Sequence, residues 1–96
     1  MSSTQRATWF VRGRVQGVGF RWWTRSRALE LGLVGHARNT ADGRVEVVAE
    51  GPPSSLDGLD RLLREDPSTT RRPGHVTSVV RQEQSAKGGI AGFVEK

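Results

Sequence analysis

The sequence predicts an α+β fold in which two helices pack on one face of an antiparallel sheet, in the order βαββαβ. Three observations predict it. Segments rich in β-branched and aromatic residues alternate with two segments of helical periodicity. Glycine, proline and Asp-Gly turn signals separate these segments. The 96 residues are 34% hydrophobic and 26% charged, which is typical of one globular domain. We therefore expect a single domain over residues 1–96, with residues 1–6 as a flexible tail.

The first segment is a strand over residues 7–12, where aromatic and β-branched residues cluster. A glycine-rich loop over residues 13–19 follows it. Residues 20–31 then form a helix, because apolar side chains recur along one face at helical spacing. Gly32 is a typical C-terminal cap and ends this helix.

The next segment is a hairpin of two strands, over residues 34–38 and 44–50. The connection between them is built around Asp42-Gly43, a pair that favours a tight turn. In the second strand, apolar residues alternate with glutamate and valine, so one face of the strand is expected to be buried.

A second helix follows the break at Gly51-Pro52-Pro53. Ser54 or Ser55 can cap its N-terminus, and four leucines at helical spacing form its apolar stripe. Asp66-Pro67 ends this helix, because the residue before proline avoids helical conformation.

Two further strands are expected over residues 75–82 and 90–94. The resulting order is that of the ferredoxin-like split βαβ sandwich, with both helices on one face of the sheet. Within it, we expect Trp9 and Trp23 in the core and Trp22 in a more exposed position.

The composition excludes some chemistries. The chain has no cysteine, which excludes thiol catalysis, thiolate metal sites and disulfides, and a cytoplasmic location is expected. No apolar run approaches the ~20 residues of a membrane span, and the N-terminus lacks the apolar core of a secretory signal. The net charge of +5 fits nucleic acid, an anionic surface or a small anionic substrate, although the charge taken alone favours a solvated basic surface.

The stretch GRVQGVGFR, residues 13–21, indicates an anion site. A glycine-rich loop between a strand and a helix presents backbone N–H groups, and the helix N-terminus adds about half a positive charge. Arg21 adds a guanidinium suited to phosphoryl oxygens. The glycines at 13, 17 and 19 match neither the P-loop nor the dinucleotide-binding pattern, so a purely structural turn remains an alternative reading of these residues alone.

Residues 13–21 resemble the acylphosphatase signature, Gly-x-Val-Gln-Gly-Val-x-Phe-Arg. Residues 31–51, LGLVGHARNTADGRVEVVAEG, resemble the second conserved stretch of that family. The resemblance implies a ferredoxin-like fold and an enzyme that hydrolyses acyl phosphates to a carboxylate and inorganic phosphate, without a metal or another cofactor. His36 departs from the family pattern, which often has an aromatic residue there, and the C-terminal segment is looser than usual.

The resemblance also implies the site residues. The phosphoryl oxygens are expected to bind the backbone N–H groups of five loop residues, namely Gln16, Gly17, Val18, Gly19 and Phe20. Arg21 matches the phosphate-binding arginine, and Asn39 matches the asparagine that positions the attacking water. Taken alone, Asn39 is typical of a turn residue, and His36 and His75 are interpreted as structural or surface residues.

The leading hypothesis is therefore a monomeric enzyme that acts on a small-molecule acyl phosphate, releases inorganic phosphate, and has no nucleic-acid or membrane partner. The alternative is a basic ferredoxin-like binding module for RNA or carbamoyl phosphate. The RNA module stacks bases on aromatic residues of a central strand. Residues 44–50 contain none, and Trp9 and Phe10 alternate between the two faces of their strand.

Overall fold

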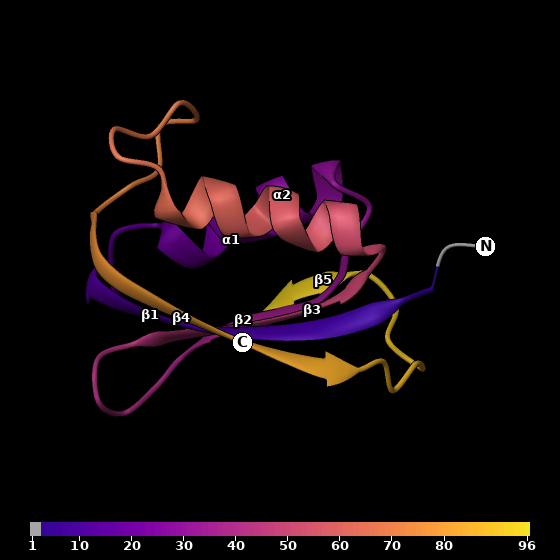
Figure 1. The fold of residues 1–96 in the computed structure, drawn as a ribbon. Helices are drawn as coiled ribbons and strands as arrows, with labels where there is room; N and C mark the ends of the chain where they lie inside the picture. The colour runs from indigo at the N-terminus through magenta and orange to yellow at the C-terminus, as the bar shows by residue number, and fades with distance from the viewer. Residues whose placement is uncertain (1–2) are drawn as a thin grey trace.

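The computed structural model describes residues 3–96, and its elements follow the predicted order (Figure 1). The strands and helices are β1 (Gln5–Arg14), α1 (Phe20–Glu30), β2 (Val34–Asn39), β3 (Val45–Gly51), α2 (Pro53–Arg64), β4 (His75–Ser85) and β5 (Phe93–Glu95). Both helices lie on the same face of the sheet, and residues 3–96 place no helix on the other face (Figure 1). The predicted α+β class and the ferredoxin-like arrangement are confirmed.

The five strands form one sheet in the order β4-β1-β3-β2-β5. The first three neighbouring pairs are antiparallel, as predicted, but β5 is parallel to β2. The expectation of a wholly antiparallel sheet is therefore wrong at this edge. After β4 the chain crosses to the opposite edge, and this crossing delivers β5 to β2 running in the same direction.

The first strand begins earlier than the sequence predicts. The expected tail over residues 1–6 is wrong for Gln5 and Arg6, which pair with β3 and β4. Arg6 Nη1 donates to Glu50 Oε2 at 3.0 Å, and this ion pair extends the regular pairing. The part of the tail prediction that concerns residues 1–2 lies outside the described residues.

The core lies between the sheet and the two helices. Trp9 and Trp23 are 0% and 2% exposed, whereas Trp22 is 61% exposed, so the three predictions for tryptophan are confirmed. Alternating side chains of β1 and β3 meet the leucine stripe of α2. The other residues of this cluster are Ala7, Val11, Val15, Phe20, Ala28, Leu33, Ala37, Val45, Val47, Ala49, Leu56, Leu59, Leu63 and Phe93.

The start of α2 differs from the prediction. The helix begins at Pro53, and Pro52 occupies the N-cap position without a side-chain hydrogen bond. Ser54 and Ser55 therefore lie within the first turn instead of capping it. Proline has its φ angle fixed near the helical value and has no N–H to satisfy, which makes it well suited to the first helical position.

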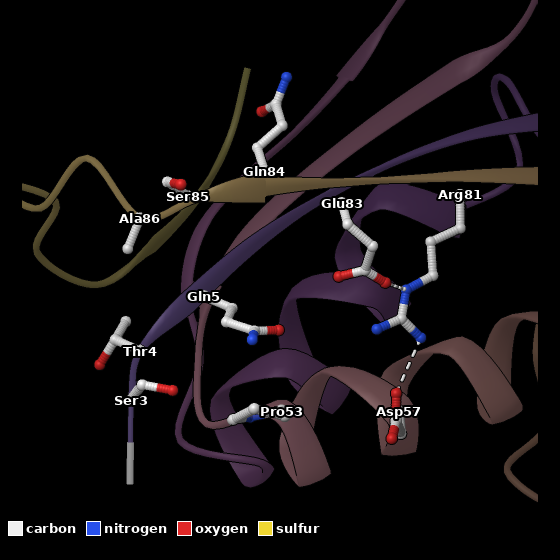
Figure 2. A pocket seen from close by; sticks show the side chains of 10 residues that line it. All are labelled: Ser3, Thr4, Gln5, Pro53, Asp57, Arg81, Glu83, Gln84, Ser85 and Ala86. Atoms are coloured by element: carbon white, nitrogen blue, oxygen red, sulfur yellow. Dashed lines mark hydrogen bonds and ion pairs between the residues drawn. The ribbon is translucent and has the colours of Figure 1, made fainter.

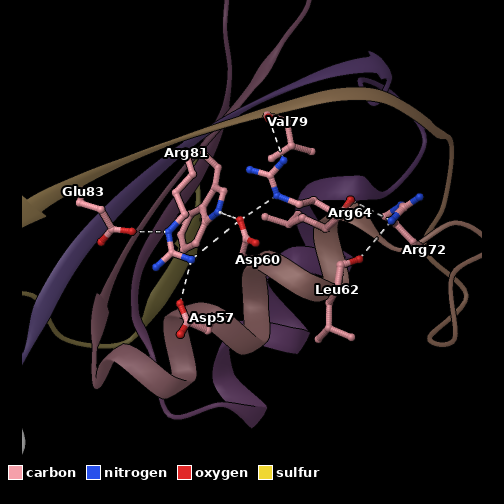
Figure 3. A network of polar contacts seen from close by, with 10 residues as sticks. Asp57, Asp60, Leu62, Arg64, Arg72, Val79, Arg81 and Glu83 are labelled. Carbon is pink, nitrogen blue, oxygen red and sulfur yellow. Dashed lines mark hydrogen bonds and ion pairs between the residues drawn. The ribbon is translucent and has the colours of Figure 1, made fainter.

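A polar network fastens α2 to the β1–β4 side of the sheet (Figure 3). Arg81 Nη1 of β4 donates to Asp57 Oδ1 of α2 at 3.0 Å. Arg64 links Asp60, at 2.9 Å, to the main-chain oxygen of Val79, at 3.1 Å. These arginines bond to groups of the protein itself, so the network serves packing.

The strand register brings three segments to one end of the sheet. Val11 near the end of β1 pairs with Val45 at the start of β3, and Val45 pairs with Asn39 at the end of β2. The loop that leads from β1 into α1 leaves from this same end. The predicted phosphate loop and the β2–β3 hairpin are therefore neighbours in the fold.

Candidate active site

The loop between β1 and α1, residues 15–19, contains two glycines in the left-handed conformation, and we call it the cradle loop. Gly17 and Gly19 adopt left-handed φ values of 73° and 87°. A Cβ added at either glycine would meet no atom within 4 Å, so these positions need glycine for its φ angle and not for space. Where right-handed and left-handed residues alternate, successive backbone N–H groups can point toward one side of a loop and form a concavity that binds an anion.

The third glycine of the stretch, Gly13, has a different role. It lies in β1 beside a β-bulge, and a Cβ there would stand 2.0 Å from the main-chain oxygen of His75. Gly74 similarly approaches the main-chain oxygen of Arg14 and the side chain of Val18. Gly13 and Gly74 thus let β4 start close beside the loop. The conspicuous glycines serve two purposes, strand packing and loop conformation.

Helix α1 begins directly at the cradle. Gly19 is its N-cap residue, and Trp23 N–H donates to the oxygen of Gly19 at 3.0 Å, which closes the first helical turn. Phe20 is buried, and its oxygen accepts from Thr24 Oγ1 at 2.9 Å, so the first turn is anchored in the core. In this helix, all of which the structure describes, no acidic residue lies in the first turn. The positive end of the helix dipole therefore faces the loop unopposed by a local carboxylate.

Arg21 reaches from the first turn of α1 toward the edge of the sheet. Its Nη1 donates to the main-chain oxygen of Lys96, and the N–H of Lys96 donates to the oxygen of Ala37 in β2 at 2.8 Å. Ala37 lies two residues before Asn39. The sheet edge thus connects the guanidinium of Arg21 to the strand that ends in Asn39.

Asn39 is exposed at the last position of β2, where the hairpin leaves the sheet. The hairpin is closed by Thr40, whose N–H donates to the oxygen of Arg44 at 2.8 Å. Gln16 of the cradle loop joins this point, because its Nε2 donates to the oxygens of Thr40 and Arg44, both at 2.9 Å. Sequence reasoning placed the backbone of Gln16 in the site but gave its side chain no role.

The hairpin carries its own charge balance. Asp42 accepts a hydrogen bond from Thr40 Oγ1, and its Oδ2 lies 2.8 Å from Arg44 Nε and 3.9 Å from Arg12 Nη2. The hydrogen bond from the Thr40 hydroxyl is the largest cause that lowers the pKa of Asp42, to about 2, and the hydrogen bond from the Arg44 side chain is the second. Asp42 is therefore ionised at neutral pH and partly offsets the arginines beside the loop.

The residues that the sequence assigned to structural roles include both histidines and two aromatic residues of β1. His36 is on the face of the sheet without helices, 3.7 Å from Glu46, and burial is the main cause that lowers its pKa. His75 is exposed at the start of β4 and pairs with Arg14. Trp9 is buried, whereas Phe10 on the opposite face lies 4.6 Å below the guanidinium of Arg44. The two aromatic residues therefore face opposite ways, as predicted.

A cavity of about 930 Å³ lies away from the cradle, between the start of β1, the start of α2 and the end of β4 (Figure 2). Its lining includes Pro53, Asp57 and Arg81, but none of the predicted site residues. Over residues 3–96, no helix has the length and apolar character needed to span a membrane. The same residues contain no group of three or more His, Cys, Asp or Glu side chains placed to hold a metal ion.

The comparisons with known proteins agree with the fold. A model of the acylphosphatase family matches residues 7–95. The chain belongs to the acylphosphatase family. An acylphosphatase of Rhodococcus jostii strain RHA1 is 58% identical over 92 residues, which are 96% of this chain and 99% of that relative. By family and fold, the chain is an acylphosphatase enzyme.

Solved structures support the same assignment. An acylphosphatase from Coxiella burnetii superposes with a TM-score of 0.83 at 30% identity, covering 98% of this chain and 94% of that one. Full-length HypF in a phosphate- and nucleotide-bound form superposes with a TM-score of 0.81 at 20% identity. That match covers 100% of this chain but 12% of HypF, and it is a likeness of fold alone.

Proposed function

We propose that the chain hydrolyses acyl phosphates without a metal ion, using a backbone cradle at residues 16–20, Arg21 and a water held by Asn39. One observation carries the proposal. The left-handed loop, the start of α1 and the end of β2 meet at one end of the sheet, in a chain of the acylphosphatase family. Arg21 is joined to β2 through Lys96, and the loop is joined to the hairpin through Gln16.

The cradle and Arg21 bind the phosphoryl group. Phosphoryl transfer needs mainly positioning and stabilisation of charge on the equatorial oxygens. Backbone N–H groups at a helix N-terminus provide fixed donors for that charge, and the guanidinium provides two more in a planar fork. In this arrangement the positive charge that a metal would supply comes from the protein itself.

Asn39 holds the attacking water in line with the bond that breaks. The water oxygen forms a bond to phosphorus while the bond from phosphorus to the acyl oxygen breaks, and the carboxylate leaves with that electron pair. The water proton passes to a phosphate oxygen. Because the conjugate acid of the leaving carboxylate has a pKa of roughly 4, it departs without protonation and no general acid is needed.

The test is turnover by the purified protein on acetyl phosphate and benzoyl phosphate, with p-nitrophenyl phosphate as a monoester, each with and without excess chelator. We expect hydrolysis of both acyl phosphates at a rate that the chelator does not change, with poor turnover of the monoester. No turnover of any acyl phosphate contradicts the function. Activity lost to chelator and restored by Mg²⁺ contradicts its metal independence.

A further inference from the structure

The side chain of Gln16 forms a bridge between the cradle loop and the β2–β3 hairpin. Its Nε2 donates to two main-chain oxygens, those of Thr40 and Arg44, at 2.9 Å each. A primary amide nitrogen has two N–H donors, and both are used here. Since both partners are carbonyl groups, only the NH₂ end of the amide fits this position, so its orientation is determined by the hydrogen bonds.

Gln16 contacts the hairpin at Thr40 and Arg44, the two residues whose main-chain hydrogen bond closes it. The N–H of Thr40 donates to the main-chain oxygen of Arg44 at 2.8 Å, and the main-chain oxygen of Thr40 also accepts from the N–H of Gly43 at 3.2 Å. Thr40 directly follows Asn39, whose own ladder partner is Val45. Within residues 3–96, no other side chain of the loop 15–19 donates a hydrogen bond to the hairpin.

We propose that Gln16 is a positioning residue that holds Asn39 at a fixed distance from the phosphate cradle. This rests on the proposed function. The cradle loop and Asn39 are separated in the chain by α1 and by the part of β2 that precedes Asn39, and Asn39 lies at the exposed base of a hairpin. A displacement of about 1 Å between reacting groups can cost about 10²-fold in rate, so a direct connection between the two parts is valuable.

The chemistry of the bridge explains why glutamine stands at this position. Glutamate has the same size, but its carboxylate would face two carbonyl oxygens with no proton to donate. Asparagine is one methylene shorter and cannot span the same gap from an unchanged loop. Methionine retains the length and volume but has no donor. These differences give a graded set of variants that all keep the backbone N–H of residue 16 for phosphate.

The decisive measurement separates turnover from phosphate binding in Gln16→Met and Gln16→Glu. We expect kcat to fall by about 10-fold to 10²-fold, with inhibition by inorganic phosphate within about two-fold of the unmodified protein. Gln82→Met, at an exposed position of β4, is the matched control and should change neither. A wild-type kcat in Gln16→Met, or an equal loss of phosphate affinity, overturns the positioning role.

A double-mutant cycle tests whether Gln16 acts through Asn39. If it does, Gln16→Met lowers kcat much less in the Asn39→Ala background than in the unmodified protein. Additive losses of kcat overturn the proposal while leaving the proposed function intact.

Amide hydrogen exchange of residues 39–45 provides a measurement that does not depend on turnover. Exchange in this hairpin should rise by about 10-fold or more in Gln16→Met and stay unchanged in Gln82→Met. An unchanged hairpin in Gln16→Met overturns the bridge. If the unmodified protein hydrolyses no acyl phosphate, the proposed function fails, and the exchange result still decides whether Gln16 holds the hairpin.

Discussion

The loop after β1 and the segment after β4 lie at opposite ends of the sheet, and each places backbone N–H groups near an arginine. At the far end, the N–H groups of Lys87 and Gly88 and the guanidinium of Arg6 all donate to the carboxylate of Glu50. Glu50 is 2% exposed, so this anion is enclosed by the protein. At the cradle end, the loop between β1 and α1 is open to solvent at Gly17 and Gly19, and Arg21 follows it in the first turn of α1.

The difference between the two ends lies in the source of the anion. Glu50 belongs to the chain, and its bonds tie the crossing segment before β5 to β3. The first turn of α1 has no acidic residue, as far as the described chain shows, so the cradle has no carboxylate of its own at that position. In the proposed function, the anion at the cradle is the phosphoryl group of the substrate. The same donor set thus serves structure at one end and, as proposed, catalysis at the other.

The largest expected effect is the loss of turnover in Arg21→Ala. Removing the guanidinium should lower kcat/KM by about 10³-fold or more, the scale for an arginine that stabilises charge in phosphoryl transfer. Arg21→Lys should recover little, because an ammonium cannot replace the planar fork. The measurement is steady-state hydrolysis of benzoyl phosphate with inhibition by inorganic phosphate.

Arg25→Ala is the matched control for Arg21. Arg25 lies one turn later in α1, and its Nε donates to the main-chain oxygen of Phe93 in β5 at 2.9 Å. It therefore makes the same kind of contact with the sheet edge, away from the cradle. Near-wild-type activity in Arg21→Ala, or an equal loss in Arg25→Ala, would refute a special role for Arg21.

Asn39→Ala should give the next largest effect. We expect kcat to fall by about 10²-fold, as when a fixed polar group is removed from an active site, with phosphate inhibition retained. Arg38→Ala is the neighbouring control, because Arg38 pairs with Glu46 at 2.6 Å on the face without helices. A loss of stability with unchanged kcat would leave Asn39 a turn residue.

Local patterns explain why the elements could be predicted from the sequence. The leucine stripe of α2 faces the core, as predicted. In β3, Val45, Val47 and Ala49 also face the core, but the expectation that only one face is buried is wrong, because Val48 and Glu50 on the other face are buried as well. The direction of β5 was not predictable, because it depends on how the chain crosses the sheet from β4. The early start of β1 involves long-range partners, because Arg6 forms its ion pair with Glu50, which lies 44 residues further along the chain.

In the candidate site, too, local sequence patterns were predictable and long-range contacts were not. The glycines and Arg21 stand together in the sequence, so a local motif indicates them, and their catalytic roles stay predictions. The side chain of Gln16 has no local partner, since Thr40 lies 24 residues further along the chain. One available signal was that glutamine, a residue with two donors, occupies a loop otherwise made of glycine and valine.

The third prediction concerns the enclosed anion. In Glu50→Gln, the charge-assisted bonds from Arg6, Lys87 and Gly88 lose their ionised acceptor, and hydrogen bonds to charged groups are worth about 2 kcal/mol. The free energy of unfolding at pH 7 should fall by about this amount, measured by urea denaturation. Glu30→Gln, in an exposed pair with Arg27, should change it by less than about 0.5 kcal/mol. An unchanged stability in Glu50→Gln contradicts a structural role for this anion.

The effect of Glu50→Gln should also depend on pH. The N–H of Lys87 is the main cause that lowers the pKa of Glu50 in the folded protein. A carboxyl with a lowered folded pKa stabilises the fold above its unfolded pKa of about 4.3 and loses that contribution as the pH falls through the folded value. The difference between the two proteins should therefore shrink below about pH 4. A difference that stays constant between pH 7 and pH 3 contradicts the ionised state of Glu50.

The smallest expected effect is the rise in the free energy of unfolding when inorganic phosphate is added to the solution. A ligand that binds only the folded state raises the free energy of unfolding by RT ln(1 + [L]/Kd), which is about 1.4 kcal/mol at ten times Kd. Inorganic phosphate should thus stabilise the unmodified protein and Glu50→Gln by the same increment, because Glu50 lies at the other end of the sheet. In Arg21→Ala the increment should disappear at the same phosphate concentration.

Urea denaturation with phosphate, compared with chloride at matched ionic strength, removes general salt effects from the measurement. Equal stabilisation of Arg21→Ala and the unmodified protein would mean that phosphate binds elsewhere, and the contrast between the two ends would then rest on Glu50 alone.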